Sequence, residues 1–244
     1  MPSEAIATWS ARVAERLRAL FLDAGNTLIF PDWARIAGWC AQAGAPVGAL
    51  ALQQACARAA AAWDDFMGGR APAPEGGILG AALEAAGLDR SARLHVLRRI
   101  EEAEREGTLW REVLPGTADA LQTLRSLGLV LGVVSNADGR VEQFLERAGL
   151  RPYLDFVIDS ARVGVEKPDP RIFRLALERA GVAADQAAHV GDLCSVDVEG
   201  ARRAGIEAVI MDPVGLYRGC DAPRIRHLAE LARALQAARR RMAG

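Results

Sequence analysis

The sequence predicts an α/β fold in which a parallel sheet is covered by helices on both faces and carries one inserted helical segment. Three observations lead to this prediction. Short apolar runs recur along the chain, amphipathic segments separate the later runs, and a long helical stretch follows the first run. Strand and helix patterns that alternate at short loop lengths are typical of parallel sheets. A chain of 244 residues can form one large domain, or a core with a smaller companion.

The strands are expected at five apolar runs: RALFLD (18–23), LVLGVV (129–134), DFVID (155–159), AAHV (187–190) and EAVIM (207–211). Helical segments separate the later four runs. TADALQTLRSL precedes LVLGVV and is closed by Gly128, a residue type that commonly ends helices. In DPRIFRLALERAG, Asp169 can cap the helix and Pro170 can take its first position.

Residues 33–112 interrupt this alternation. They are rich in Ala and show helical periodicity in ARIAGWCAQAG, ALQQACARAAAAWDDFM, GILGAALEAAG and SARLHVLRRIEEAEREG, without a strand pattern. A Gly/Pro-rich loop, GGRAPAPEGG (68–77), divides the helical segments. We therefore expect an α/β core at 16–32 and 113–244, an all-helical inserted domain at 33–112, and an N-terminal extension at 1–15.

The composition argues against two classes of binding partner. Half of the residues are apolar and the net charge is −1, which gives no electrostatic reason to expect a nucleic acid or a membrane. The N-terminus does not resemble a signal peptide, and no apolar run is long enough to span a bilayer. The four cysteines lack CxxC spacing and are expected to be reduced thiols. We expect a cytoplasmic protein, either a monomer or a homodimer.

The candidate functional residues follow the expected strands. Ligands of an open parallel sheet gather at the carboxyl ends of its strands. The polar residues expected there are Asp23, Ser135, Asn136, Lys167, Asp192 and Asp197. Lys167 is the only lysine of the chain, whereas all other basic residues are Arg. Clustered carboxylates are costly without a cation, and oxygen ligands favour Mg²⁺. Carboxylates, Mg²⁺, a hydroxyl and an ammonium together suit phosphoryl transfer.

Four stretches resemble, in order, the four motifs of the haloacid dehalogenase superfamily of hydrolases: DAGNT, SN, the lysine of EKPDP, and GDLCSVD. The resemblance implies a Rossmann-like core and a helical cap between the first two motifs. It implies Asp23 as nucleophile and Mg²⁺ ligand, with the Gly25 carbonyl, Asp192 and Asp197 as further ligands. The residues implied to hold the phosphate are Ser135, Asn136, Lys167 and Thr27. Arg70, in the cap's Gly/Pro loop, is a candidate substrate contact because binding residues favour such loops.

Gly25 departs from the family pattern. Phosphatases of the family usually carry Asp at this position, which protonates the leaving group and then activates water. Without that acid, a phosphatase is expected to favour substrates with good leaving groups. Asp32, just past the first strand, is a possible substitute. The predicted function is a Mg²⁺-dependent hydrolase of a small phosphorylated metabolite, acting through an aspartyl-phosphate.

Two alternatives remain open at this stage. Dehalogenases of the family also lack the second acid and displace halide with the aspartate, without metal. The acidic pair Asp192 and Asp197 is hard to explain around an anionic haloacid. The other alternative is a catalytically weak member of the family that acts as a binding or regulatory module.

Overall fold

The computed structural model describes residues 3–217 and 219–243. The chain divides into two compact units. The first unit comprises the described residues of 1–29, 113–213 and 221–244, and the second comprises those of 30–112 and 214–220. The sequence did not predict that the short segment 214–220 belongs to the second unit, since nothing in it resembles the inserted helical segment.

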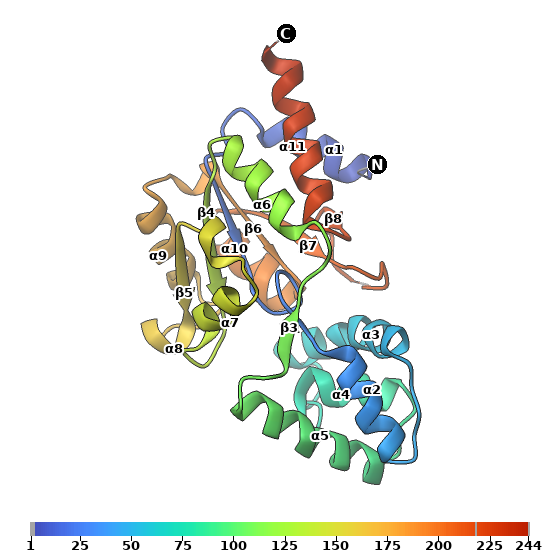
Figure 1. The fold of residues 1–244 in the computed structure, drawn as a ribbon. Helices are drawn as coiled ribbons and strands as arrows, with labels where there is room; N and C mark the ends of the chain where they lie inside the picture. Colours follow the sequence, from blue (N-terminus) through green and yellow to red (C-terminus); the bar gives the residue numbers. More distant parts are fainter. Residues whose placement is uncertain (1–2, 218, 244) are drawn as a thin grey trace. The chain divides into compact units, whose positions relative to one another are not determined.

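A six-stranded sheet forms the centre of the first unit, in the order β5-β4-β1-β6-β7-β8, and every neighbouring pair is parallel (Figure 1). Its strands are β1 (Ala19–Leu22), β4 (Val130–Ser135), β5 (Phe156–Asp159), β6 (Ala187–Gly191), β7 (Glu207–Met211) and β8 (Arg224–Ile225). The five predicted runs are all strands, whereas the two-residue β8 is too short to show a sequence pattern. Leu22 pairs with Val133 and Val190, so the residues after β1, β4 and β6 emerge at one edge.

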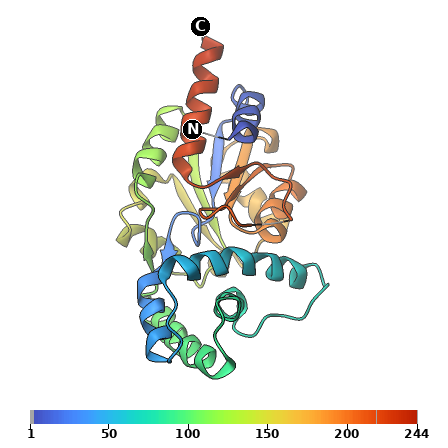
Figure 2. The ribbon, with the colours of Figure 1, turned by 90° about the vertical axis from the view of Figure 1, so that its right-hand side faces the viewer.

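Helices cover both faces of this sheet, which confirms the predicted Rossmann-like core. The helices are α1 (Glu4–Val13), α6 (Thr117–Ser126), α7 (Val141–Arg147), α8 (Ser160–Val163), α9 (Pro170–Ala180), α10 (Glu199–Arg203) and α11 (Leu228–Ala243). Shorter turns are the 3₁₀ segments η1 (Arg151–Tyr153) and η2 (Ala184–Gln186) and the π-helical turn η3 (Cys194–Val198). Figure 2 shows α6 on one side of the sheet and α10 on the other.

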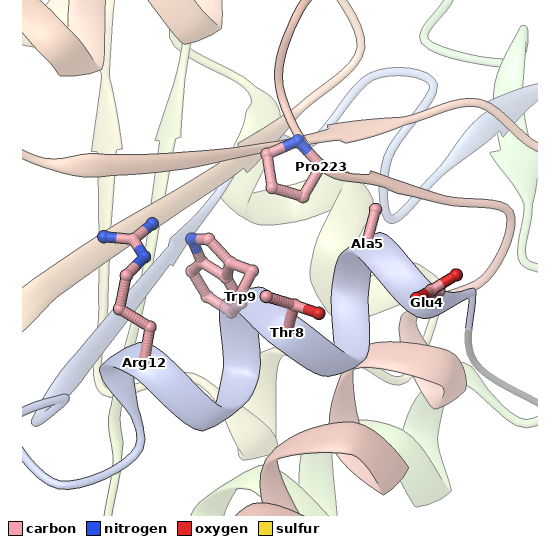
Figure 3. A pocket seen from close by; sticks show the side chains of 6 residues that line it. All are labelled: Glu4, Ala5, Thr8, Trp9, Arg12 and Pro223. Atoms are coloured by element: carbon pink, nitrogen blue, oxygen red, sulfur yellow. The ribbon is translucent and has the colours of Figure 1, made fainter.

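The N-terminal helix α1 is fixed to the sheet unit by its own polar groups. Trp9 donates its indole N–H to Glu207 over 3.2 Å, and Arg12 and Arg16 pair with the same carboxylate at the start of β7. Beside these residues, α1 and Pro223 line an open surface pocket of about 520 Å³ (Figure 3). Residues 4–13 therefore pack on the sheet unit, and their helix starts at a Ser3 cap.

The second unit is helical. Its helices are α2 (Trp33–Gln42), α3 (Ala49–Met67), α4 (Gly77–Ala85) and α5 (Arg90–Arg105). They match the four segments of helical periodicity, and their apolar faces share a core that includes Trp33 and Trp39. The sequence did not predict the antiparallel ribbon of β2 (Phe30–Pro31) and β3 (Trp110–Glu112). Two and three residues are too few to establish the two-residue period of a strand.

Two further sequence-based expectations can be compared with the structure. Cys40 is a free thiol, whereas Cys194 and Cys220 are each disulfide-bonded, so the expectation of reduced thiols is wrong for these two residues. CxxC spacing indicates only pairs of cysteines that are close in the sequence, so its absence does not exclude a disulfide. Among the helices of the described residues, none combines the length and the apolar character needed to cross a bilayer.

Candidate active site

The first feature of the site is the sharp turn that follows β1. The Asp23 N–H donates to the carbonyl of Val190 over 2.8 Å, so the ladder between β1 and β6 continues up to this carboxylate. The Ala24 carbonyl then accepts the N–H of Ile29 over 2.9 Å, which closes a compact turn. Asn26 lies inside the turn with a φ of 52°, a left-handed conformation that Asn adopts more readily than most residues. The turn leaves Asp23 largely buried at the strand end, with 8% of its surface exposed.

Lys167 lies between two carboxylates of the same edge. Its Nζ donates to Asp23 Oδ1 over 2.8 Å and to Asp197 Oδ1 over 2.6 Å, and only 2% of its side chain is exposed. Burial by itself would lower the pKa of Lys167. The charges and hydrogen bonds of Asp197 and Asp23 outweigh burial and raise that pKa above its ordinary value. Lys167 is therefore a fixed, buried ammonium ion.

Asp197 is saturated by donors from three parts of the unit. Its Oδ1 accepts from Lys167 and, over 2.9 Å, from His189 Nε2, while its Oδ2 accepts the N–H of Leu193 over 3.0 Å. Burial favours the neutral form of Asp197, but Lys167 and His189 outweigh burial and hold the pKa of this carboxyl well below its ordinary range. A Cβ on Gly191 would overlap the Asp197 carboxylate, so β6 must end in glycine to accommodate it.

Asp192, which follows β6, lacks comparable compensation. Its Oδ2 accepts from Asn26 Nδ2 over 3.1 Å. Burial, followed by the charges of Asp197 and Asp23, raises the pKa of Asp192 well above its ordinary value. Burial likewise raises the pKa of Asp23, against the opposing effect of Lys167. Oxygen atoms of the three aspartates lie within 4.8 Å of one another, close enough to hold one divalent cation.

Asn136 and Ser135 lie at the end of the neighbouring strand β4. Ser135 is 4% exposed. The Asn136 amide donates to the Lys167 carbonyl over 2.9 Å and accepts the Lys167 N–H over 2.8 Å. Both polar atoms of this side chain are thus engaged with the backbone of the lysine. Asn136, predicted to hold phosphate, supports the segment that carries Lys167.

The loop after β4 is held by two residues that the sequence analysis did not single out. Asp159 accepts the N–H groups of Gly139 over 3.0 Å and Val141 over 3.3 Å. The Ser160 hydroxyl accepts the N–H of Ala137 over 3.1 Å and donates to its carbonyl over 3.2 Å. These bonds fix the backbone N–H groups that follow Ser135. An acid and a hydroxyl at a strand end could have indicated this role.

The remaining predicted residues differ in their placement. Thr27 lies in the turn after Asp23 and is 2% exposed, and its hydroxyl has no hydrogen-bond partner within residues 3–217 and 219–243. Arg70 belongs to the second unit, where its largely exposed side chain pairs with Asp65 over 2.9 Å. Asp32, the possible substitute acid, caps α2 by accepting the N–H of Arg35 over 2.9 Å.

The sequence pattern did not identify His189 as a residue of the site. It lies inside the apolar run AAHV, where an imidazole is easily taken for a core residue, and its side chain is fully buried. The signal that could have found it is its spacing. Residues 189 and 191 of a strand point to the same face, so His189 shares a face with the glycine that accommodates Asp197.

Comparisons with known proteins agree with this arrangement. Residues 17–205 match the family described as haloacid dehalogenase-like hydrolase. The mouse protein "Haloacid dehalogenase-like hydrolase domain-containing protein 3" is 47% identical over 100 residues, which cover 41% of this chain and 40% of the mouse protein. The matched region thus spans well under half of that relative's length.

Two other similar proteins match over most of their length. "Phosphoserine phosphatase" of Thermus thermophilus is 35% identical over 210 residues, or 83% of this chain and 74% of that protein. Among solved structures, a 2-haloacid dehalogenase of Pseudomonas syringae pv. Tomato is 27% identical with a TM-score of 0.53, covering 91% of this chain and 99% of that one. The family match covers more than half of the sequence and includes all four motifs, and the chain therefore belongs to the haloacid dehalogenase-like hydrolases.

Proposed function

We propose that this hydrolase is a Mg²⁺-dependent phosphatase that acts on a small phosphorylated metabolite through an aspartyl-phosphate on Asp23. The observation that carries the proposal is the charge balance of the site. Three carboxylates face one ammonium, because His189 is buried and its pKa is lowered, so two negative charges are uncompensated. One divalent cation balances these charges. The sequence similarity to a protein named as a phosphatase supports the same class of reaction.

The donor set fits Mg²⁺ with one refinement of the sequence-based ligand set. Both oxygens of Asp197 already accept hydrogen bonds from protein groups. Asp23 and Asp192 retain lone pairs, and the Gly25 carbonyl belongs to the same turn as Asn26. We therefore propose Asp23, Asp192 and the Gly25 carbonyl as ligands, with Asp197 holding Lys167. When bound, Mg²⁺ would neutralise negative charge on the transferring phosphoryl group.

Each residue at the strand ends then has a chemical task. A carboxylate oxygen of Asp23 attacks phosphorus, and the bond from phosphorus to the leaving oxygen breaks, with its electron pair departing on that oxygen. The Lys167 ammonium and the Ser135 hydroxyl would stabilise the phosphoryl oxygens. Water then attacks phosphorus, which releases phosphate and restores the Asp23 carboxylate. Thr27 and Arg70 remain proposed substrate contacts.

A dehalogenase is the second candidate, because the chain is also similar to a solved 2-haloacid dehalogenase and lacks an acid at Gly25. That reaction would bring a substrate carboxylate next to Asp192, whose charge is already compensated only in part. Coulomb repulsion therefore disfavours a haloacid at this site in the absence of metal.

A substrate screen tests the proposal. The purified protein is assayed with p-nitrophenyl phosphate, simple alkyl phosphates, acetyl phosphate and 2-chloropropionate, each with Mg²⁺ and with chelator. We expect phosphate release that requires Mg²⁺ and is abolished by Asp23→Asn, which is nearly isosteric but is a poor nucleophile. Halide release in chelator would establish the dehalogenase instead. Hydrolysis of none of these substrates in Mg²⁺ would favour a binding module.

The charge balance also predicts a stability effect. In chelator at neutral pH, Asp192→Asn should raise the melting temperature, since it removes a partly buried charge that Lys167 and Asn26 compensate only in part. Because the folded state binds the Asp192 proton more tightly than the unfolded state, the wild-type protein should lose stability as pH rises towards the raised pKa of Asp192, and the variant less so. Thermal melts across pH measure both.

Mg²⁺ should stabilise the wild-type protein more than the Asp192→Asn variant. At about 100 times its Kd, Mg²⁺ should stabilise the wild-type protein by about 2.7 kcal/mol, or roughly 5–10 °C, and the variant little. Asp119→Asn, an exposed substitution of the same kind on α6, is the control and should change neither melt by much. Equal Mg²⁺ shifts in the wild-type and Asp192→Asn proteins would contradict the proposed ligand set.

The absence of an acid at position 25 predicts a preference for substrates with good leaving groups. With no acid at this position, activity should depend steeply on the leaving group, and p-nitrophenyl phosphate should be cleaved much faster than alkyl phosphates. Gly25→Asp should raise kcat/KM for alkyl phosphates by up to about 10²–10⁴-fold, the usual contribution of general acid catalysis. Gly25→Asn, of the same size but unable to transfer a proton, should not. If the native protein cleaves both classes equally fast, another residue supplies the proton.

A further inference from the structure

His189 makes a hydrogen bond that the proposed reaction does not yet explain. Its imidazole is fully buried in the middle of β6, with Nε2 at 2.9 Å from Asp197 Oδ1 and its ring edge-on to Phe173 at 5.0 Å between centroids. Its other nitrogen, Nδ1, has no hydrogen-bond partner among the residues that the structure describes. An imidazole buried with one unsatisfied nitrogen costs free energy that an apolar side chain of similar size would not. Packing alone therefore does not account for a histidine here.

The hydrogen bond has a definite direction. Asp197 Oδ1 carries the charge that pairs with Lys167, so it accepts from both neighbours. The hydrogen of the imidazole must then lie on Nε2, which leaves Nδ1 as the bare nitrogen. The pKa of His189 is lowered by burial, in keeping with a neutral ring that acts as a donor.

We propose that His189 is a positioning residue that fixes the Asp197 carboxylate and, through it, the Lys167 ammonium beside Asp23. The oxygen that His189 holds is the same one that holds Lys167 Nζ. The Leu193 N–H holds the other oxygen, and Gly191 leaves room for the carboxylate against β6. With His189 in place the carboxylate has one orientation. Without it, Asp197 keeps, among the described residues, only the Leu193 N–H as a donor besides the lysine that it positions.

The effect of His189 on catalysis rests on the proposed function, whereas its positioning of Lys167 does not. Displacing a positioned group by about 1 Å can reduce a rate by about 10²-fold while leaving substrate binding little changed. The loss should therefore be seen in kcat, whereas KM, which depends on the whole substrate, should change less.

Three substitutions separate positioning from packing. His189→Gln can place an amide N–H near the position of Nε2, whereas His189→Asn places one near Nδ1, out of reach of Asp197. His189→Leu fills the space without a donor. We expect the Asn and Leu variants to lose about 10–10²-fold in kcat with KM within a few-fold of wild type, and the Gln variant to retain most of the activity. The melting temperatures of the variants should not follow the order of their kcat values. His189→Leu removes the unsatisfied Nδ1, so it should lose activity without a matching loss of stability.

A second measurement does not depend on activity. Lys167 is the only lysine, so ¹⁵N-lysine labelling gives one side-chain ammonium signal. Held by two carboxylates, that ammonium should exchange slowly with water and give a sharp correlation in the wild-type and His189→Gln proteins. The signal should broaden or shift in the Asn and Leu variants.

Each outcome bears on the proposal. A wild-type protein without phosphatase activity would refute the proposed function, while the lysine signal would still support or refute the positioning role. If His189→Leu keeps both kcat and the wild-type lysine signal, His189 is a packing residue and the proposal is wrong. A loss of kcat with an unchanged lysine signal would also overturn it, since the effect would not pass through Lys167.

Discussion

The site depends on one buried ammonium ion held between two carboxylates. Desolvating Lys167 is costly, and the two short contacts to Asp23 and Asp197 offset that cost. These three residues come from three distant parts of the chain, so the ion pairs fix β1, the segment before α9 and η3 relative to one another. Much of the surrounding structure supports this arrangement: Asn136 holds the backbone of Lys167, and His189 holds Asp197.

The sharing of Lys167 by two carboxylates also determines the net charge of the site. Because Lys167 is held by Asp23 and Asp197, its charge offsets that of Asp192 only in part, and the site retains a net negative charge suited to a divalent cation. Asp23 is held by the ammonium at the end of a strand, where its position varies little. Gly25 provides no proton donor, so under the proposed function the site would supply a nucleophile and electrostatic stabilisation while the leaving group departs largely unassisted. The proposed function therefore favours substrates whose leaving group departs as a stable anion.

The sequence predicted the charged members of the site, because a rule of topology applies to them. Asp23, Lys167 and Asp192 follow apolar runs, and the carboxyl ends of parallel strands meet at one edge. The supporting contacts could not be predicted in this way. The sequence led us to expect Asn136 only as a phosphate-binding residue. Its pairing with the backbone of Lys167 could not be predicted, because that pairing depends on how a loop folds. His189 resembles a core residue in sequence, and only the position of η3 brings Asp197 to it. The ribbon of β2 and β3 is too short to leave a periodic signal.

The central claim is that Asp23 forms a covalent bond to phosphorus. The most direct test is to quench the protein during turnover of p-nitrophenyl phosphate in Mg²⁺, reduce it with borohydride, and sequence the peptides by mass spectrometry. An aspartyl-phosphate is an acyl phosphate, and reduction converts it into homoserine. The account predicts homoserine at position 23 that requires both substrate and Mg²⁺. Turnover without any reduction product at position 23, or with a product at another carboxylate, would contradict it.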